Sequence, residues 1–184
     1  MGGKEILVLA GSPRIHGNSD MLADAFIEGA KKAGHSVTKI YAAAHKVNGC
    51  LGCNKCWSDG THCIQKDDMV KLYPAFEKAT VLVFASPLYY YSWSAQLKCV
   101  LDRTFTYASP DRKSAMAVKE CALLVAAETR EVADLDGLVG SYRITARFCH
   151  WKDKGILLAT GVYEKGAVQA GDWLEQAKKM GMEI

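Results

Sequence analysis

The sequence predicts an α/β fold built around one mostly parallel sheet. Five short apolar segments alternate with segments in which apolar residues recur at helical spacing. One of these segments, residues 81–85, is apolar throughout, as expected for a central parallel strand that is covered on both faces. Right-handed connections place the carboxyl ends of such strands at one edge of the sheet, where ligands bind in folds of this class.

Each element follows from a local pattern. Strands are expected where apolar residues cluster, and their ranges are 4–10, 37–41, 81–85, 121–126 and 155–160. Helices are expected where apolar residues recur every three or four positions, and their ranges are 21–33, 67–79, 97–105, 135–151 and 173–177. Gly34 is a natural end for the first helix, and Asp67 with Asp68 is a natural start for the second. Residues 50–66 show neither pattern, so we expect an irregular segment there.

Length and composition limit the class of protein. The 184 residues suit a single domain, residues 1–184, with a full hydrophobic core. The net charge of +3 is too small to indicate nucleic-acid binding. Neither a stretch of membrane-spanning length nor a signal peptide is evident, so we expect a cytoplasmic protein. In that reducing compartment, seven cysteines indicate metal or redox chemistry rather than a disulfide framework.

A loop rich in Gly, Ser and Asn follows the first predicted strand and leads directly into a helix. Its sequence is GSPRIHGNS, residues 11–19. This order of elements places backbone N–H groups and hydroxyls at the positive end of a helix, which suits a phosphate. The loop lacks the Walker A and G-x-G-x-x-G patterns, so its donors are Ser12, Asn18 and Ser19, with Arg14 as its cation. An ordinary helix N-cap is the alternative, because Ser and Asn are preferred capping residues.

The loop after the third predicted strand is the most aromatic stretch of the chain. Its sequence is SPLYYYSW, residues 86–93. We expect it at the same sheet edge as the first loop, where an aromatic shelf beside a phosphate site suits a flat ring with a phosphorylated tail. Pro87 fixes the backbone, so that neighbouring N–H groups can face the polar edge of the ring. The alternative is that these aromatic residues belong to the core or to an interface.

Taken together, the two loops carry a family resemblance. The first loop, residues 86–90, QLK at 96–98 and LDR at 101–103 resemble the NAD(P)H-dependent FMN reductases of the flavodoxin-like fold. The likeness covers nearly the whole chain in order. It implies a flavodoxin-like three-layer sandwich with a five-stranded parallel sheet of order 2-1-3-4-5. It also implies FMN as the cofactor and a homodimer or homotetramer.

The resemblance also assigns site residues. Those that would hold the FMN phosphate are Ser12, Arg14, Asn18 and Ser19. Those that would flank the ring are Pro87, Leu88, Tyr89 and Tyr90. If the protein is a reductase, Tyr89, Tyr90 and Trp93 would also shape the pocket for the electron acceptor. Those that would close the site from the fourth strand are Glu128, Thr129 and Arg130.

A second motif places four cysteines close together in the sequence. It lies in the cysteine-rich loop, residues 49–66, and its members are Cys50, Cys53, Cys56 and Cys63. Thiolate-rich sites favour iron–sulfur clusters or zinc. The spacing resembles that of the iron–sulfur flavoproteins of the same superfamily, in which such a motif ligates a 4Fe–4S cluster beside FMN. Free thiols lining a loop near the flavin, a zinc site and a redox disulfide are the alternatives.

These motifs predict an FMN-dependent NAD(P)H oxidoreductase. The nicotinamide would give a hydride to the flavin, and the electrons would pass to a quinone, a free flavin, a metal ion or another acceptor. Because the flavin carries the chemistry, we assign no catalytic side chain. The main alternative is an iron–sulfur flavoprotein electron carrier, whose 4Fe–4S cluster exchanges electrons with a ferredoxin-like partner. A non-catalytic sensor of a phosphate ligand is a third hypothesis.

Overall fold

A parallel sheet of five strands organises the chain. In the computed structural model, which describes residues 2–58, 62–108 and 116–184, the strand order is β2-β1-β3-β4-β5. The strands are β1 (Glu5–Ala10), β2 (Ser36–Tyr41), β3 (Val81–Pro87), β4 (Glu120–Ala126) and β5 (Lys152–Ala159). Every neighbouring pair is parallel. The predicted α/β class and the predicted order 2-1-3-4-5 are therefore confirmed.

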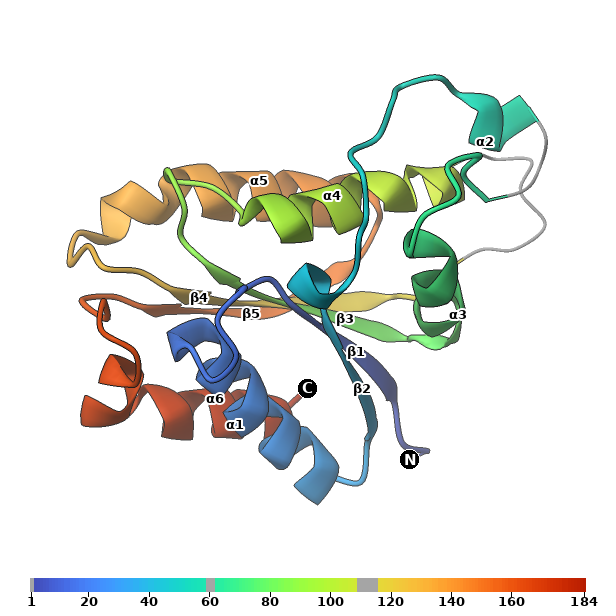
Figure 1. Ribbon diagram of the computed structural model, residues 1–184. Helices are drawn as coiled ribbons and strands as arrows, with labels where there is room; N and C mark the ends of the chain where they lie inside the picture. The colour runs from blue at the N-terminus through green and yellow to red at the C-terminus, as the bar shows by residue number, and fades with distance from the viewer. Residues whose placement is uncertain (1, 59–61, 109–115) are drawn as a thin grey trace.

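Helices cover both faces of this sheet and give the predicted three layers. The α-helices are α1 (Asn18–Lys32), α2 (Lys55–Ser58), α3 (Met69–Lys78), α4 (Ala95–Arg103), α5 (Asp136–Phe148) and α6 (Trp173–Met182). Short 3-10 helices are η1 (Ala42–Ala44), η2 (Thr104–Ala108), η3 (Val132–Leu135) and η4 (Ala167–Ala170). Figure 1 shows α1 and α6 on one face of the sheet and α3, α4 and α5 on the other.

Alternating side chains of the strands enter two separate cores. In β1, Leu7 and Leu9 lie in the core beneath α3, α4 and α5, whereas Ile6 and Val8 lie in the core beneath α1 and α6. Successive side chains of a strand point to opposite faces of the sheet, so a strand between two helical layers must be apolar on both sides. This requirement explains why the central strands appear in the sequence as unbroken apolar runs.

The boundaries differ from the predicted ones where side chains bind the backbone. Helix α3 starts at Met69 instead of residue 67, because the Asp67 carboxylate accepts a hydrogen bond from the Met69 N–H at 3.1 Å from outside the helix. The Asp68 carboxylate binds the N–H of Lys46 at 2.9 Å instead. Strand β5 starts at Lys152, three residues earlier than predicted, because the pairing with β4 continues past an irregularity in the register.

One buried serine joins the loops that follow β1 and β3. The Ser94 hydroxyl donates to the carbonyl of Gly11 at 2.7 Å and accepts from the N–H of Leu97, so that it also caps α4. The N–H of Ser94 donates to the Ser86 hydroxyl at 3.1 Å. A Cβ atom at Gly11 would lie 2.7 Å from the Ser94 oxygen, so only glycine allows this approach. The two loops are thus fastened together inside the protein.

No helix in the described part of the chain is both long enough and apolar enough to cross a bilayer.

Candidate functional site

The loops at the carboxyl edge of the sheet surround one cavity of about 190 Å³. The residues that line it are Ser12, Arg14, Gly17, Asn18, Ser19, Pro87, Leu88, Tyr89, Ala126, Glu128, Val162, Tyr163 and Lys165. The structure therefore brings together the loops after β1, β3, β4 and β5. The volume is below the roughly 300–1,000 Å³ of pockets that enclose whole ligands. It is suited to the phosphorylated end of a ligand, with the remainder lying along the rim.

Loop 11–17 is held in shape by its own hydrogen bonds. The Ser12 hydroxyl accepts from the N–H of Arg14 at 3.0 Å and donates to the carbonyl of Arg14 at 3.2 Å. The N–H of Gly17 donates to that same carbonyl at 2.9 Å. Residue Gly17 is the N-cap of α1, and no side chain caps the helix. The N-cap interpretation of the Ser and Asn residues in this loop is therefore not the arrangement that the structure adopts.

Ser19, which follows loop 11–17 at the start of α1, has a side chain whose hydrogen bonding is incomplete. Its side chain is in the first turn of α1, the residue is 2% exposed, and its hydroxyl has no partner among the described residues. A buried polar group without a partner is costly, so such groups are rare in folded proteins. In a cavity wall beside the positive end of a helix, this hydroxyl is suited to donate to an anionic ligand.

The Asn18 side chain, predicted to hold a phosphate, instead makes hydrogen bonds to the loop after β5. Its amide nitrogen donates to the carbonyls of Val162 and Glu164, and its amide oxygen accepts from the N–H groups of Gly166 and Val168. The carboxamide is therefore committed to the loop after β5. The expectation that this side chain holds a phosphate differs from what the structure shows, although Asn18 does line the cavity.

The aromatic loop divides into residues that line the cavity and residues that do not. Pro87, Leu88 and Tyr89 line it. Tyr90 is fully exposed at the tip of a two-residue hairpin turn, which Tyr89 and Ser92 close by exchanging backbone hydrogen bonds of 3.1 and 3.0 Å. Both turn residues have positive φ, 45° at Tyr90 and 60° at Tyr91, a conformation that is strained for tyrosine.

Trp93 lies in the core instead of the acceptor pocket. The residue is 5% exposed, and its ring centroid is 5.4 Å from that of Phe84. Its indole N–H donates to the Ser141 hydroxyl at 2.9 Å. The expectation for Trp93 therefore differs from the structure, because the residue satisfies both its apolar ring and its polar nitrogen between β3 and α5.

The loop after β4 contributes one of its three predicted residues. Glu128 lines the cavity. Thr129 instead supports its own loop, because its hydroxyl donates to Asp134 at 2.6 Å and accepts from the N–H of Glu131. Arg130 lies against Gly161 in the loop after β5. Neither Thr129 nor Arg130 is part of the cavity wall.

The loop after β5 is the part of the site that the sequence analysis missed. Val162, Tyr163 and Lys165 line the cavity, and Lys165 adds a second cation to Arg14. The available signal was its position, since this loop also leaves the carboxyl end of a predicted parallel strand. Because its residues carry no recognisable phosphate-binding pattern, its position at the end of a parallel strand was the one signal for this loop.

The cysteine-rich loop lies at a distance from this cavity. Figure 1 shows α2 beyond the carboxyl end of α4. The Trp57 ring stacks on Phe105 with centroids 4.7 Å apart, and its indole N–H donates to the Phe105 carbonyl at 3.1 Å. Helix α4 starts beside the cavity and has nine residues, which separates its two ends by about 13 Å. Among the described residues, the cavity wall contains no cysteine.

The four thiols of the motif form a loose group. Cys50 and Cys53 are exposed, while Cys56 and Cys63 are half-buried. Burial raises the pKa of Cys56, and the charge of the nearby Cys63 raises it further, followed by those of Cys50 and Cys53. In the part of the chain that the structure describes, no three of these sulfur atoms lie within 4.8 Å of one another. Tetrahedral zinc would hold them about 3.8 Å apart, as its bond length of about 2.3 Å requires. The arrangement therefore does not fit a single zinc ion.

The sequence profile of the family described as NADPH-dependent FMN reductase matches residues 5–136. The chain belongs to this family. The matched range includes the loops after β1, β3 and β4 and the cysteine-rich loop, and it ends before the loop after β5.

Relatives with similar sequences carry a related name. A protein named iron-sulfur flavoprotein from Archaeoglobus fulgidus is 36% identical over 99 residues, which are 54% of this chain and 44% of that protein. A protein of the same name from Methanosarcina thermophila is 31% identical over 100 residues, which are 54% of this chain and 52% of that protein. The matches thus span about half the length of these relatives.

Solved structures share the fold of this FMN reductase family member over its whole length. An NAD(P)H:quinone oxidoreductase from Methanothermobacter marburgensis has a TM-score of 0.77 at 18% identity, with 98% of this chain and 96% of that chain covered. An azoreductase from Bacillus anthracis has a TM-score of 0.73 at 19% identity, with both chains fully covered. At these identities the likeness shows the flavodoxin-like fold.

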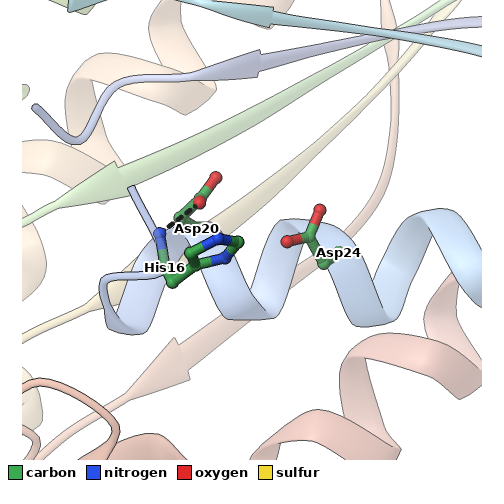
Figure 2. A group of neighbouring side chains, drawn as sticks. All are labelled: His16, Asp20 and Asp24. Atoms are coloured by element: carbon green, nitrogen blue, oxygen red, sulfur yellow. Dashed lines mark hydrogen bonds between the residues drawn. The ribbon is translucent and has the colours of Figure 1, made fainter. Parts of the chain in front are cut away.

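A second group of polar residues, at the end of loop 11–17 and the start of α1, is an internal ion-pair network. Figure 2 shows His16 beside Asp20 and Asp24, and one ligand atom of each residue lies within 4.8 Å of the others. Lys39 of β2 places its ammonium 2.6 Å from both carboxylates. Burial would lower the pKa of Lys39, but hydrogen bonds to Asp20 and Asp24 outweigh burial and raise it. The protein therefore supplies its own cation here.

A buried ion pair closes the base of the cysteine-rich loop. The Arg103 guanidinium donates to the Asp67 carboxylate at 2.7 and 3.1 Å and to the Asn48 carbonyl at 3.0 Å. The N–H groups of Asn48 and Met69 donate to the same carboxylate. Burial alone would raise the pKa of Asp67, but the hydrogen bonds from Arg103, Asn48 and Met69 outweigh burial and lower it. This carboxylate thus fastens both ends of the loop to α4.

Replacing Asp67 by Asn should destabilise the protein by about 3 kcal/mol at pH 7, because it leaves the buried charge of Arg103 without its partner. A carboxylate with a lowered folded-state pKa stabilises the fold above its unfolded pKa of about 3.9, and this contribution disappears as the pH falls through the folded value. The difference between the two proteins should therefore shrink below about pH 4. Urea unfolding at pH 7 and at lower pH measures both quantities.

The matched control is Asp102→Asn, which breaks the exposed Lys98–Asp102 pair on α4. Exposed pairs are worth about 0.5 kcal/mol or less. Equal losses of stability in the two variants would contradict the role assigned to Asp67.

Proposed function

We propose that this chain binds FMN at the cavity and passes electrons from NAD(P)H through it to an acceptor such as a quinone, a free flavin or a metal ion. The unpartnered, buried hydroxyl of Ser19 in the cavity wall carries this proposal. It lies in the first turn of a 15-residue helix whose N-terminus has no side-chain cap. A phosphate at that position would satisfy the hydroxyl and the free N–H groups together.

The residues around the cavity fit the parts of FMN. Ser19 and Arg14 offer a hydroxyl and a cation to the phosphate, and the hydrogen-bonded Ser12 holds the loop in shape. Pro87, Leu88 and Tyr89 offer an apolar and aromatic wall for the ring side. Membership of the NADPH-dependent FMN reductase family supports the same ligand.

Bound FMN would supply the redox chemistry, taking a hydride from the nicotinamide and releasing electrons singly or in pairs. The chain would bind, orient and shield it. The preformed loop 11–17 and the buried tie between Ser94 and Gly11 hold the two halves of the site in fixed relation. Such preorganisation lowers the entropic cost of binding and of correct alignment.

The direct test is uptake and reduction of FMN. The purified protein should retain FMN, and NADPH or NADH added without oxygen should bleach the flavin absorption near about 450 nm within seconds. A protein that binds FMN but transfers no electrons from either nicotinamide would be a sensor or carrier instead of a reductase. A protein that takes up no FMN would refute the proposal altogether.

Ser19→Ala should weaken FMN binding about tenfold, because a hydrogen bond to a charged group is lost. Riboflavin lacks the phosphate, so its affinity should not change. The same substitution should leave the stability of the ligand-free protein equal or slightly higher, since it removes a buried group without a partner. Fluorescence titration measures the affinities. Ser92→Ala, on the exposed hairpin, is the control, and equal FMN affinity in all three proteins would refute the role of Ser19.

An iron–sulfur flavoprotein is the second candidate function. The observation that favours it is the cysteine-rich loop, in which one short segment carries four free thiols that lack the close spacing of a zinc site. The relatives named iron-sulfur flavoprotein support it. We propose Cys50, Cys53, Cys56 and Cys63 as ligands of a 4Fe–4S cluster that exchanges electrons with a ferredoxin-like partner.

Cys53→Ser should remove iron and sulfide, together with the broad absorption near about 400–420 nm that a cluster gives. FMN content should stay unchanged, because the loops that line the cavity lie beside the start of α4 and the cysteine-rich loop lies beyond its other end. Iron and sulfide analysis of protein purified without oxygen measures the cluster. Cys99→Ser, outside the motif, is the matched control. Equal metal content in both variants, or no metal in the unaltered protein, would rule out this cluster.

A symmetric assembly in the cytoplasm completes the proposal. Ile144 and Phe148 on α5 are 58% and 65% exposed. Exposed apolar side chains on one helix favour burial against another protein surface. They support a homodimer or homotetramer.

A further inference from the structure

The loop after β5, residues 160–166, is tied to the first residue of α1 on both sides of Lys165. The Asn18 amide nitrogen donates to the carbonyls of Val162 at 3.2 Å and Glu164 at 2.9 Å. Its amide oxygen accepts from the N–H of Gly166 at 3.0 Å and from that of Val168 at 3.3 Å. A carboxamide has two donor hydrogens and two acceptor lone pairs, so Asn18 makes every hydrogen bond available to it.

These bonds fix the backbone around Lys165. Glu164 and Gly166 are its two chain neighbours, and Asn18 holds both of them. Gly166 has φ +89°, a left-handed conformation that glycine adopts without strain and that turns the chain into η4. The four hydrogen bonds from the Asn18 side chain therefore hold the loop after β5 in a fixed position relative to the start of α1.

Lys165 and Arg14 are the two cations of the cavity wall. Within residues 2–58, 62–108 and 116–184, neither has an ion-pair partner, whereas Lys32, Lys39, Lys71 and Lys98 each pair with a carboxylate. A phosphate monoester carries a charge of about −1.5 to −2 at pH 7. The Glu128 carboxylate also lines the cavity and opposes an anion. Arg14 alone cannot balance a dianion, and Lys165 supplies the second positive charge.

We infer that the loop after β5 is a second phosphate-binding arm, in which Lys165 binds the phosphate and Asn18 positions Lys165. The inference rests on the proposed FMN site and extends it beyond loop 11–19. Asn18 is then a positioning residue, whose effect on the ligand passes through the arm. Lys165 discriminates a phosphorylated flavin from the free one, because it faces the charge that riboflavin lacks.

The test compares FMN with riboflavin. Lys165→Met should weaken FMN binding about tenfold, as expected for the loss of a charge-assisted hydrogen bond, and leave riboflavin affinity unchanged. Lys165→Arg, which keeps the charge, should bind FMN within about threefold of the unaltered protein. The matched control is Lys178→Met. Lys165 and Lys178 both line a neighbouring cavity, but Lys178 does not line the proposed FMN site, and its ammonium pairs with Glu28.

A double-mutant cycle tests the positioning role. Asn18→Ala should weaken FMN binding by a similar factor, and adding Lys165→Met to it should cause little further loss, because both changes remove one interaction. A merely structural Asn18 would give losses that multiply, and it would weaken riboflavin binding as well. Either result would overturn the role of Asn18.

The outcomes separate this inference from the function on which it rests. If the unaltered protein binds FMN more tightly than riboflavin and Lys165→Met keeps that preference in full, the second arm is refuted and the FMN site stands. If the unaltered protein binds no FMN, both are refuted. A lost preference in Lys165→Met, kept in Lys165→Arg and Lys178→Met, supports the arm.

Discussion

The hydrogen bond from Ser94 to Gly11 is the constraint on which the site depends. It joins the loop after β1 to the start of α4 inside the protein, where neither partner can turn to water instead. The Ser86 hydroxyl binds the N–H of the same serine, so β1, β3 and α4 meet at one point. The two sides of the cavity, which the proposed function assigns to the phosphate and to the ring, therefore keep a fixed separation. A rigid separation is what a ligand with a charged tail and a flat ring requires.

The second organising feature is that the cavity and the cysteine-rich loop lie at opposite ends of α4. Helix α4 begins beside the cavity and ends where Arg103 binds Asp67 at the base of the cysteine-rich loop. One helix thus supports both places, from opposite ends. Both motifs are anchored by buried polar groups in addition to apolar packing, and such groups specify position because they tolerate few alternative arrangements. The thiols are held apart from the cavity of the same chain by this architecture.

The sequence predicted the sheet and three of the four loops because these follow from local signals, whereas the strand order was implied by the family resemblance. Unbroken apolar runs report burial on both faces, and the carboxyl-edge rule then brings loops 11–19 and 86–93 together. It did not predict the partners of Asn18, which lie 144 or more residues away. Trp93 was misplaced because an aromatic residue in a loop has no periodicity that separates inward from outward. The network of Lys39 with Asp20 and Asp24 likewise needs the folded chain, since β2 must lie beside α1 to form it.

The buried hydroxyl of Ser19 links ligand supply to the amount of folded protein in a cell. Because no described residue satisfies this hydroxyl, a phosphorylated ligand that bonds to it would bind the native state and not the unfolded chain. Ligand supply then shifts the folding equilibrium by mass action, and the unfolded fraction is what proteases degrade. If the proposed ligand FMN binds here, the steady-state amount of this protein should rise when flavin is plentiful and fall when flavin is scarce, without any change in gene expression.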